Sequence, residues 1–243
     1  MADGLLLLHA WPLDARMWEP QLPALDDLTV AAPHHPGFGG SEPAGEVSTM
    51  SACAARAVSA LDEAGIERAV VCGLSMGGYV AFELWRRAPE RFLGLILANT
   101  RAVADTPEGA AGRHALAERL RREGNVLVDE PPALLAEDAP AALLEHVRSL
   151  IADQTAEAIA ASAIGMAERP DSTPDLPGIG VPTLVVTSTG DRLIAPEVSG
   201  AMAGAIPGAR LEVLEGVGHL TNLEAPEVFG RLLLEHVAAC GLA

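Results

Sequence analysis

The fold is decided by residues 69–78, Ala69-Val70-Val71-Cys72-Gly73-Leu74-Ser75-Met76-Gly77-Gly78. The aliphatic run at 69–72 predicts a strand that is buried on both faces of a sheet, and a helical pattern follows directly. The chain has to turn sharply between them, and glycines suit this turn because a Cβ at Gly73 or Gly77 would strike the turn or the neighbouring strand. We therefore expect Ser75 to stand at the tip of a tight strand-to-helix turn.

Short aliphatic runs alternate with helical patterns on both sides of this turn. Such alternation is typical of a mostly parallel, doubly wound sheet with helices on both faces. Ser48 is the expected N-cap of the first helix, and Gly65 its C-terminal stop. Strands are expected at 5–8, 28–32, 69–72, 93–98, 182–188 and 209–214, and helices at 48–64, from about 76 to 89, at 196–205 and at 226–239.

The alternation is interrupted between Asn99 and about Pro177, where the pattern predicts helices only. These helices are expected at 108–123, 133–135, 139–152 and 156–168. A helical stretch inside a strand–helix alternation indicates an insertion that lies over one end of the sheet. We expect a single α/β core formed by residues 1–101 and 176–243, with a helical cap formed by residues 102–175.

The composition excludes several classes of protein. The 243 residues include 16 basic residues, all arginine, against 33 acidic ones, and the net charge of −17 argues against nucleic acid or an anionic membrane as a partner. No apolar run reaches the roughly 18–20 residues that span a bilayer, and the N-terminus lacks the features of a signal peptide. Three cysteines without CxxC spacing suit a reducing compartment. We expect a soluble, cytoplasmic monomer or homodimer.

The residues around Ser75 allow nucleophilic catalysis. A serine hydroxyl attacks a carbonyl only when a base removes its proton and an acid orients that base. His219 follows the expected strand 209–214, and Asp191 follows the strand 182–188. Both therefore lie at carboxyl ends of strands, in the chain order Ser, Asp, His that this architecture uses. The sequence predicts a catalytic triad of Ser75, Asp191 and His219.

Three other acids compete with Asp191 for this role. Asp105 follows the strand 93–98 but lies six residues beyond Asn99, without a tight turn to fix it. Asp129 and Asp138 lie deeper in the inserted helices.

The expected pocket has backbone donors and an apolar lining. Two backbone N–H groups are needed to bind the oxyanion, and those of Met76 and Trp11 are the candidates, because Pro12 has no N–H. The expected substrate-binding side chains are Trp11, Met76, Leu134, Leu143, Val147 and Met166. Three arginines could bind a substrate carboxylate, although bracing or solvated roles are favoured for Arg101, Arg113 and Arg169. An uncharged small-molecule ester is the expected substrate.

Four histidines at strand ends raise a metal site as an alternative. His9, His34, His35 and His219 show no HxH or HxxxH spacing. We expect His9 and His34 to form hydrogen bonds with the loops around the oxyanion site instead. No metal and no cofactor are expected.

These motifs resemble the α/β-hydrolase superfamily over essentially the whole chain, and within it the small capped microbial carboxylesterases. Motifs shared across the superfamily are Leu8-His9-Ala10-Trp11-Pro12-Leu13-Asp14, Gly73-Leu74-Ser75-Met76-Gly77-Gly78 and Gly218-His219-Leu220. Narrower motifs at the lid are Asn99-Thr100-Arg101-Ala102 with Asp105-Thr106-Pro107-Glu108, and Gly165-Met166-Ala167-Glu168-Arg169-Pro170-Asp171. The resemblance implies an α/β-hydrolase fold and metal-free ester hydrolysis through an acyl-enzyme.

The chain departs from the family in three places. Ala10 stands where a glycine is usual, and His34-His35 where an aspartate is usual. Only residues 1–4 precede the first expected strand, so we expect the family's usual first hairpin to be absent and the sheet to have about six strands, with 28–32 near an edge. Relatives with the same triad include enol-lactone and C–C bond hydrolases and perhydrolases, which remain alternatives. A non-catalytic binding protein with the same fold is a further alternative.

Overall fold

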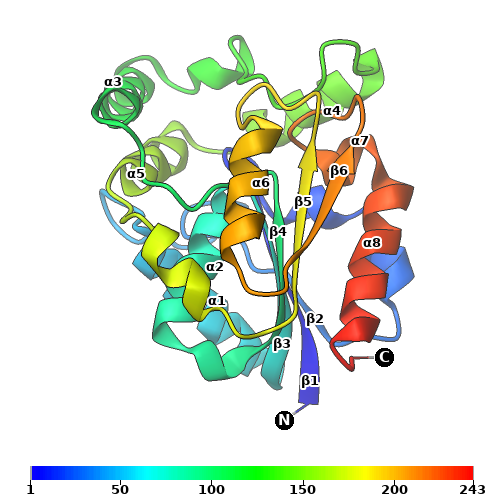
Figure 1. The fold of residues 1–243 in the computed structure, drawn as a ribbon. Helices are drawn as coiled ribbons and strands as arrows, with labels where there is room; N and C mark the ends of the chain where they lie inside the picture. Colours follow the sequence, from blue (N-terminus) through cyan, green and yellow to red (C-terminus); the bar gives the residue numbers. More distant parts are fainter. Residues whose placement is uncertain (1, 243) are drawn as a thin grey trace.

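Six parallel strands form one sheet in the order β2-β1-β3-β4-β5-β6 (Figure 1). The computed structural model describes residues 2–242. The strands are β1 (Ala2–Leu8), β2 (Val30–Ala31), β3 (Ile66–Leu74), β4 (Phe92–Ala98), β5 (Thr183–Ser188) and β6 (Arg210–Leu214). The predicted parallel sheet of about six strands is confirmed, and the short β2 lies at one edge.

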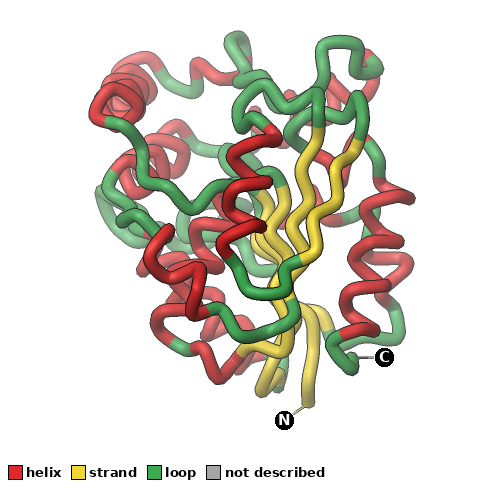
Figure 2. Tube along the Cα trace, viewed as in Figure 1, coloured by secondary structure: helices red, strands yellow, loops and turns green. Residues whose placement is uncertain are grey.

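Helices cover both faces of this sheet (Figures 1 and 2). One face packs against α1 (Met50–Glu63), α2 (Met76–Arg87) and α6 (Pro196–Ala205), and the other against α8 (Pro226–Ala239) and the short helix η1 (Ala15–Trp18). Successive side chains of a strand point to opposite faces. In β1, Leu5 and Leu7 therefore join the core under α8, whereas Leu6 and Leu8 join the core under α1 and α2. Burial on both faces explains why β1 ends in the continuous leucine run 5–8.

The segment between β4 and β5 lies over the carboxyl ends of the strands, at the top of Figure 1. It contains α3 (Pro107–Glu123), α4 (Ala141–Ala152) and α5 (Ala156–Ala167), with short 3-10 helices at Val126–Val128 and Thr173–Gly178. Within residues 2–242, no helix is both long and apolar enough to cross a bilayer.

The helix predicted at 133–135 is wrong, because residues 131–140 are irregular. Their backbone groups bond to the loop and short helix that follow β6. The N–H of Leu220 donates to the carbonyl of Leu134 at 3.0 Å, and the N–H of Ala136 donates to the carboxylate of Glu224 at 3.0 Å. These long-range bonds satisfy backbone groups that a helix would otherwise pair within the segment.

The start of α1 also differs from the prediction. Thr49, not Ser48, is the N-cap, and its hydroxyl accepts a hydrogen bond from the N–H of Ala52 at 3.1 Å. The Ser48 hydroxyl is buried and lies 3.6 Å from the sulfur of Cys53. The helix therefore begins one residue later than the sequence suggests, although the type of cap is the expected one.

Candidate active site

Ser75 occupies the strained turn between β3 and α2. Its φ is +56° and its ψ −114°, a conformation that an L-residue rarely adopts and that costs about 1–3 kcal/mol. Neighbouring groups hold it there. The N–H of Ser75 donates to the carbonyl of Ala98 at 2.9 Å, and its carbonyl accepts from the hydroxyl of Thr100 at 2.7 Å. The side chain of Ser75 is thereby presented above the carboxyl end of the sheet.

The glycines beside Ser75 leave no room for a Cβ, as the sequence predicts. A Cβ at Gly73 would overlap the carbonyl of Gly77 across the turn. A Cβ at Gly77 would overlap the carbonyl oxygen of Leu8 in β1. The obstacle in both cases is backbone, which cannot rotate away as a side chain can.

We expect Gly77→Ala to lower the free energy of unfolding by at least about 1–3 kcal/mol, because β1 and α2 must separate to admit the methyl group. Gly112→Ala is the matched control, since Gly112 is an exposed residue of α3 with open space around it. That change should raise stability by about 0.5–1 kcal/mol. Urea denaturation of both variants measures the two effects. Wild-type stability of Gly77→Ala would contradict the close packing of β1 on this turn.

His219 and Asp191 form a buried pair at the ends of β6 and β5. The Nδ1–H of His219 donates to Oδ2 of Asp191 at 2.7 Å. The backbone N–H groups of Leu193 and Ile194 donate to the other carboxylate oxygen at 2.8 and 3.0 Å. Burial raises the pKa of Asp191, but hydrogen bonds from His219 and other donors outweigh it and lower the pKa below its usual value. The carboxylate is therefore ionised, and Nε2 of His219 is left to accept a proton.

Asn99 supports this pair, a role that its place in the motif 99–102 did not predict. It is buried, has a φ of +44°, and donates from Nδ2 to Oδ2 of Asp191 at 3.0 Å and to the hydroxyl of Ser188 at 2.8 Å. Its carbonyl oxygen accepts from the hydroxyl of Thr221 at 2.9 Å. Asn99 directly follows β4 and therefore lies beside the other strand ends, and this position is the signal that could have identified it.

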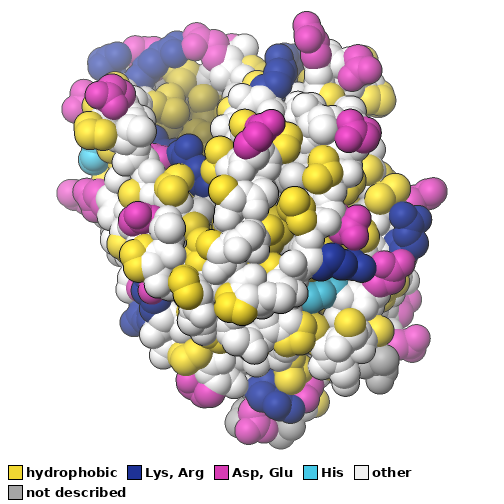
Figure 3. Space-filling view, in the orientation of Figure 1, with side chains coloured by type: hydrophobic (Ala, Val, Ile, Leu, Met, Phe, Trp, Pro, Cys, Tyr) yellow, Lys and Arg dark blue, Asp and Glu magenta, His cyan; other side chains and the backbone are white. Residues whose placement is uncertain are grey.

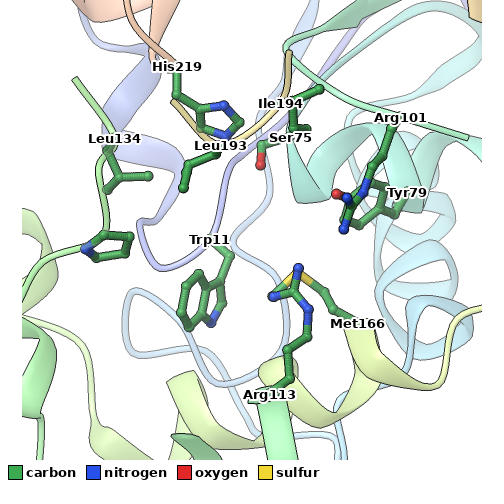
Figure 4. A pocket seen from close by; sticks show the side chains of 11 residues that line it. Trp11, Ser75, Tyr79, Arg101, Arg113, Leu134, Met166, Leu193, Ile194 and His219 are labelled. Carbon is green, nitrogen blue, oxygen red and sulfur yellow. The ribbon is translucent and has the colours of Figure 1, made fainter. Parts of the chain in front are cut away.

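Ser75 and His219 line the same cavity, which has a volume of about 160 Å³ (Figure 4). Figure 3 shows a hollow between α3 and the upper end of α6, with hydrophobic side chains in its depth. The other lining residues come from the core and from the segment above it: Trp11, Tyr79, Arg101, Arg113, Pro132, Leu134, Met166, Leu193 and Ile194.

Three of the predicted substrate-binding side chains, Trp11, Leu134 and Met166, line this cavity. The others do not. The side chain of Met76 is buried in the core under α1 and α2, because the first turn of α2 points it down onto the sheet. Leu143 and Val147 lie on α4 and pack in the core on the α8 side, so their apolar faces serve packing.

The two expected oxyanion donors are unoccupied within the described residues. Met76 is the first residue of α2, where an N–H has no partner in the helix, and the N–H of Trp11 likewise donates to no described group. The indole N–H of Trp11 donates to the carbonyl of Ile159 in α5 at 3.1 Å, which fixes the ring across the cavity. Neither backbone N–H donates to another group among the described residues, which is a requirement for an oxyanion donor.

A sequence profile of the alpha/beta hydrolase family matches residues 5–232. The chain belongs to the alpha/beta hydrolase family. The predicted fold class and the resemblance to this superfamily are thereby confirmed.

Solved structures agree with this assignment to the alpha/beta hydrolases. An esterase from Thermogutta terrifontis, solved with malate bound, is 39% identical, with a TM-score of 0.93 over 99% of this chain and 92% of that one. The enol-lactonase from Burkholderia xenovorans LB400 is 29% identical, with a TM-score of 0.89 over 98% of this chain and 92% of that one. These likenesses support a hydrolase activity.

The first curated relatives that the chain matches are longer proteins. The dihydrolipoyllysine-residue acetyltransferase component of the acetoin cleaving system from Cupriavidus necator is 30% identical over 97% of this chain. The chain spans 64% of that protein, and less than two thirds of the length of the first curated relatives that it matches.

The histidines near the expected oxyanion donors bond to the backbone. The Nδ1–H of His9 donates to the carbonyl of Ala10 at 3.0 Å, and its Nε2 accepts from the N–H of His35 at 2.9 Å. Burial lowers the pKa of His9 to about 3, so it is neutral at neutral pH. Nδ1 of His34 accepts from the N–H of Ala15 at 3.3 Å. His9 and His34 thus fix loops, as predicted. No described group of three His, Cys, Asp or Glu side chains is arranged to bind a metal.

The other acids that the sequence offered as partners of His219 do not bond to it. Asp105 is buried among three arginines, with ion pairs to Arg101, to Arg113 Nε at 2.6 Å and to Arg169 Nη1 at 3.1 Å. Asp129 and Asp138 are exposed. Of the four acids considered from sequence, Asp191 is the one that bonds to His219.

Proposed function

We propose that this hydrolase is a carboxylesterase that cleaves small carboxylic esters through an acyl-enzyme. One observation carries the proposal: a buried His219–Asp191 pair and a serine at a strained strand-to-helix turn face one small cavity. This combination of nucleophile, base and orienting acid is suited to acyl transfer.

The reaction follows from the proposed roles. Nε2 of His219 takes the proton of the Ser75 hydroxyl as its oxygen attacks the ester carbonyl. The N–H groups of Trp11 and Met76 bind the resulting oxyanion. His219 then gives the proton to the leaving alkoxide, and water repeats the sequence to release the acid. Asp191 holds the His219 tautomer throughout and stabilises its protonated form.

Residues 102–175 are proposed to act as a cap on the core of residues 1–101 and 176–243. This part of the chain contributes Arg113, Pro132, Leu134 and Met166 to the cavity, opposite Ser75 and His219 from the core. By covering the strand ends, the cap would shield the acyl-enzyme and strengthen the electrostatic interactions around it.

A second candidate is hydrolysis of an enol-lactone by the same triad. The likeness to the Burkholderia xenovorans enol-lactonase favours it, because a lactone is a cyclic ester and needs the same nucleophile and oxyanion donors. The two candidates differ in the shape of the substrate that the cavity admits.

A panel of p-nitrophenyl esters from acetate to decanoate, assayed beside five- and six-membered lactones, tests both candidates. A cavity of about 160 Å³ has the size of one that holds benzene. We therefore expect kcat/KM to be highest for acyl chains of roughly two to four carbons and to fall for longer ones. Preference for lactones over all the open esters would favour the second candidate, and turnover of neither class would contradict the proposal.

A further inference from the structure

Three arginines beside the cavity carry more charge than their surroundings neutralise. Arg101, Arg113 and Arg169 surround one carboxylate, that of Asp105, which is almost fully buried. Among the described residues none of the three forms an ion pair with a second acid, so three cations share one directly paired carboxylate. Asp171 interacts with Arg169 at longer range, which leaves Arg101 and Arg113, among the described residues, as the members without a second acidic neighbour. The whole chain has a net charge of −17, so a positive cluster at the cavity is against the general trend.

Arg169 is the structural member of this cluster. Its side chain is only 3% exposed, and it donates to the carbonyls of Met166 at 2.7 Å and Val103 at 3.0 Å. Its guanidinium also lies 4.0 Å from the centre of the Tyr79 ring. Backbone carbonyls and Asp105 therefore engage both of its Nη groups, while its Nε is buried and has no partner among the described residues.

Arg101 and Arg113 retain bonding capacity on the cavity side. Arg101 bonds to Asp105 through Nη2 and Arg113 through Nε, and both side chains line the cavity together with Ser75 (Figure 4). Their remaining N–H groups form no hydrogen bond with any residue between 2 and 242, and Nε of Arg101 is also buried. Guanidinium groups with unused donors bind carboxylates well.

We propose that Arg101 and Arg113 form a carboxylate-binding subsite, and that the substrates are half-esters of short dicarboxylic acids. This inference rests on the proposed esterase function. A half-ester replaces the uncharged ester that the sequence led us to expect. The sequence does not show that three arginines share the single carboxylate of Asp105, and the fold does.

The free carboxylate belongs to the acyl part of the substrate. His219 has to reach the oxygen of the leaving alcohol, so that alcohol lies on the His219 side of Ser75. In Figure 4, Arg101 lies on the other side of Ser75 from His219, and Arg113 lies below Ser75, beside Met166. Neither arginine lies on the His219 side of Ser75, so we assign their carboxylate ligand to the acyl part. The small cavity limits the acyl part to a chain about as long as succinyl.

The test compares monomethyl succinate with methyl levulinate, in which a methyl ketone replaces the carboxylate at nearly the same size. We expect the wild type to prefer the succinate in kcat/KM by at least about tenfold, and Arg113→Gln and Arg101→Gln each to lose about tenfold of that ratio. Arg113→Lys should retain part of it, because the charge remains. Arg119→Gln on the same helix α3 removes the ion pairs with Glu123 and Glu130 and should leave the ratio unchanged.

Several results would overturn the inference. Equal losses on both substrates in Arg113→Gln and Arg101→Gln would mean that the arginines only brace the fold. A preference for O-acetylglycolate, whose carboxylate is on the alcohol part, would refute the acyl placement.

If the esterase proposal itself is wrong, the wild type will hydrolyse none of these esters, which is a different result from those above. Calorimetric titration of Ser75→Ala with succinate still tests the subsite in that case. Binding that is lost on adding Arg113→Gln supports the subsite, and absence of binding refutes it.

Discussion

Ser75→Ala is expected to lower kcat/KM for short esters by about 10⁴-fold or more, because it removes the proposed nucleophile of the acyl-enzyme. The oxyanion donors and the binding surface remain, so the Michaelis constant should change far less than kcat. The variant keeps the turn and its hydrogen bonds, which involve only the backbone of residue 75, and we expect its melting temperature to match the wild type.

Steady-state hydrolysis of p-nitrophenyl acetate and thermal unfolding measure these two expectations. Ser59→Ala is the matched control, since that hydroxyl lies on the exposed side of α1 and bonds only to the carbonyl of Ala55. Its activity should be unchanged. A fluorophosphonate should label the wild type once per chain and leave Ser75→Ala unlabelled. Ester turnover that survives in Ser75→Ala would show that another nucleophile acts.

Asp191→Asn is expected to lower kcat/KM by about 10³–10⁴-fold while preserving the fold. The new amide can keep its oxygen on the N–H groups of Leu193 and Ile194, which places its NH₂ against His219. Nδ1 of His219 must then accept a hydrogen bond, so the proton moves to Nε2 and the imidazole can no longer take the proton of Ser75. The NH₂ group of Asn99, which now donates to Oδ2 of Asp191, would then face the NH₂ group of the new asparagine, which is not an acceptor.

The rate of Asp191→Asn is compared with that of Asp62→Asn, which removes an exposed ion pair with Arg91. Circular dichroism checks that both variants are folded. Near-normal turnover of Asp191→Asn would mean that a different acid orients His219, and Asp105 would then have to be tested in the same way.

The strands and the juxtaposition of Asp191 and His219 could be predicted because they depend on local patterns. A buried aliphatic run followed by a sharp turn marks the end of a parallel strand, and all parallel strands end at the same edge of the sheet. Two polar residues that directly follow neighbouring strands must therefore be close in space. The glycines at 73 and 77 were predictable for a similar reason, since the turn needs them wherever it occurs.

The lining of the cavity depends on contacts that the sequence pattern does not contain. The apolar face of α4 was identified from its spacing, but the spacing cannot say whether that face meets the cavity or the core, and Leu143 and Val147 meet the core. Arg101 and Arg113 belong to different elements and share Asp105 only after folding. The role of Asn99 depends likewise on side chains from β5 and from the loop after β6.

The irregular segment 131–140 has a consequence for engineering by segment exchange. Leu134 and Ala136 form hydrogen bonds with Leu220 and Glu224, which lie in the stretch that follows His219. The proposed cap therefore contacts the segment that carries the proposed base. A cap grafted from a relative to change specificity would replace the residues that bond to Leu220 and Glu224. This change would shift the segment that holds His219. Successful grafts should therefore keep residues 131–140 from this chain and exchange only the helices on either side, so the cap is modular only in part.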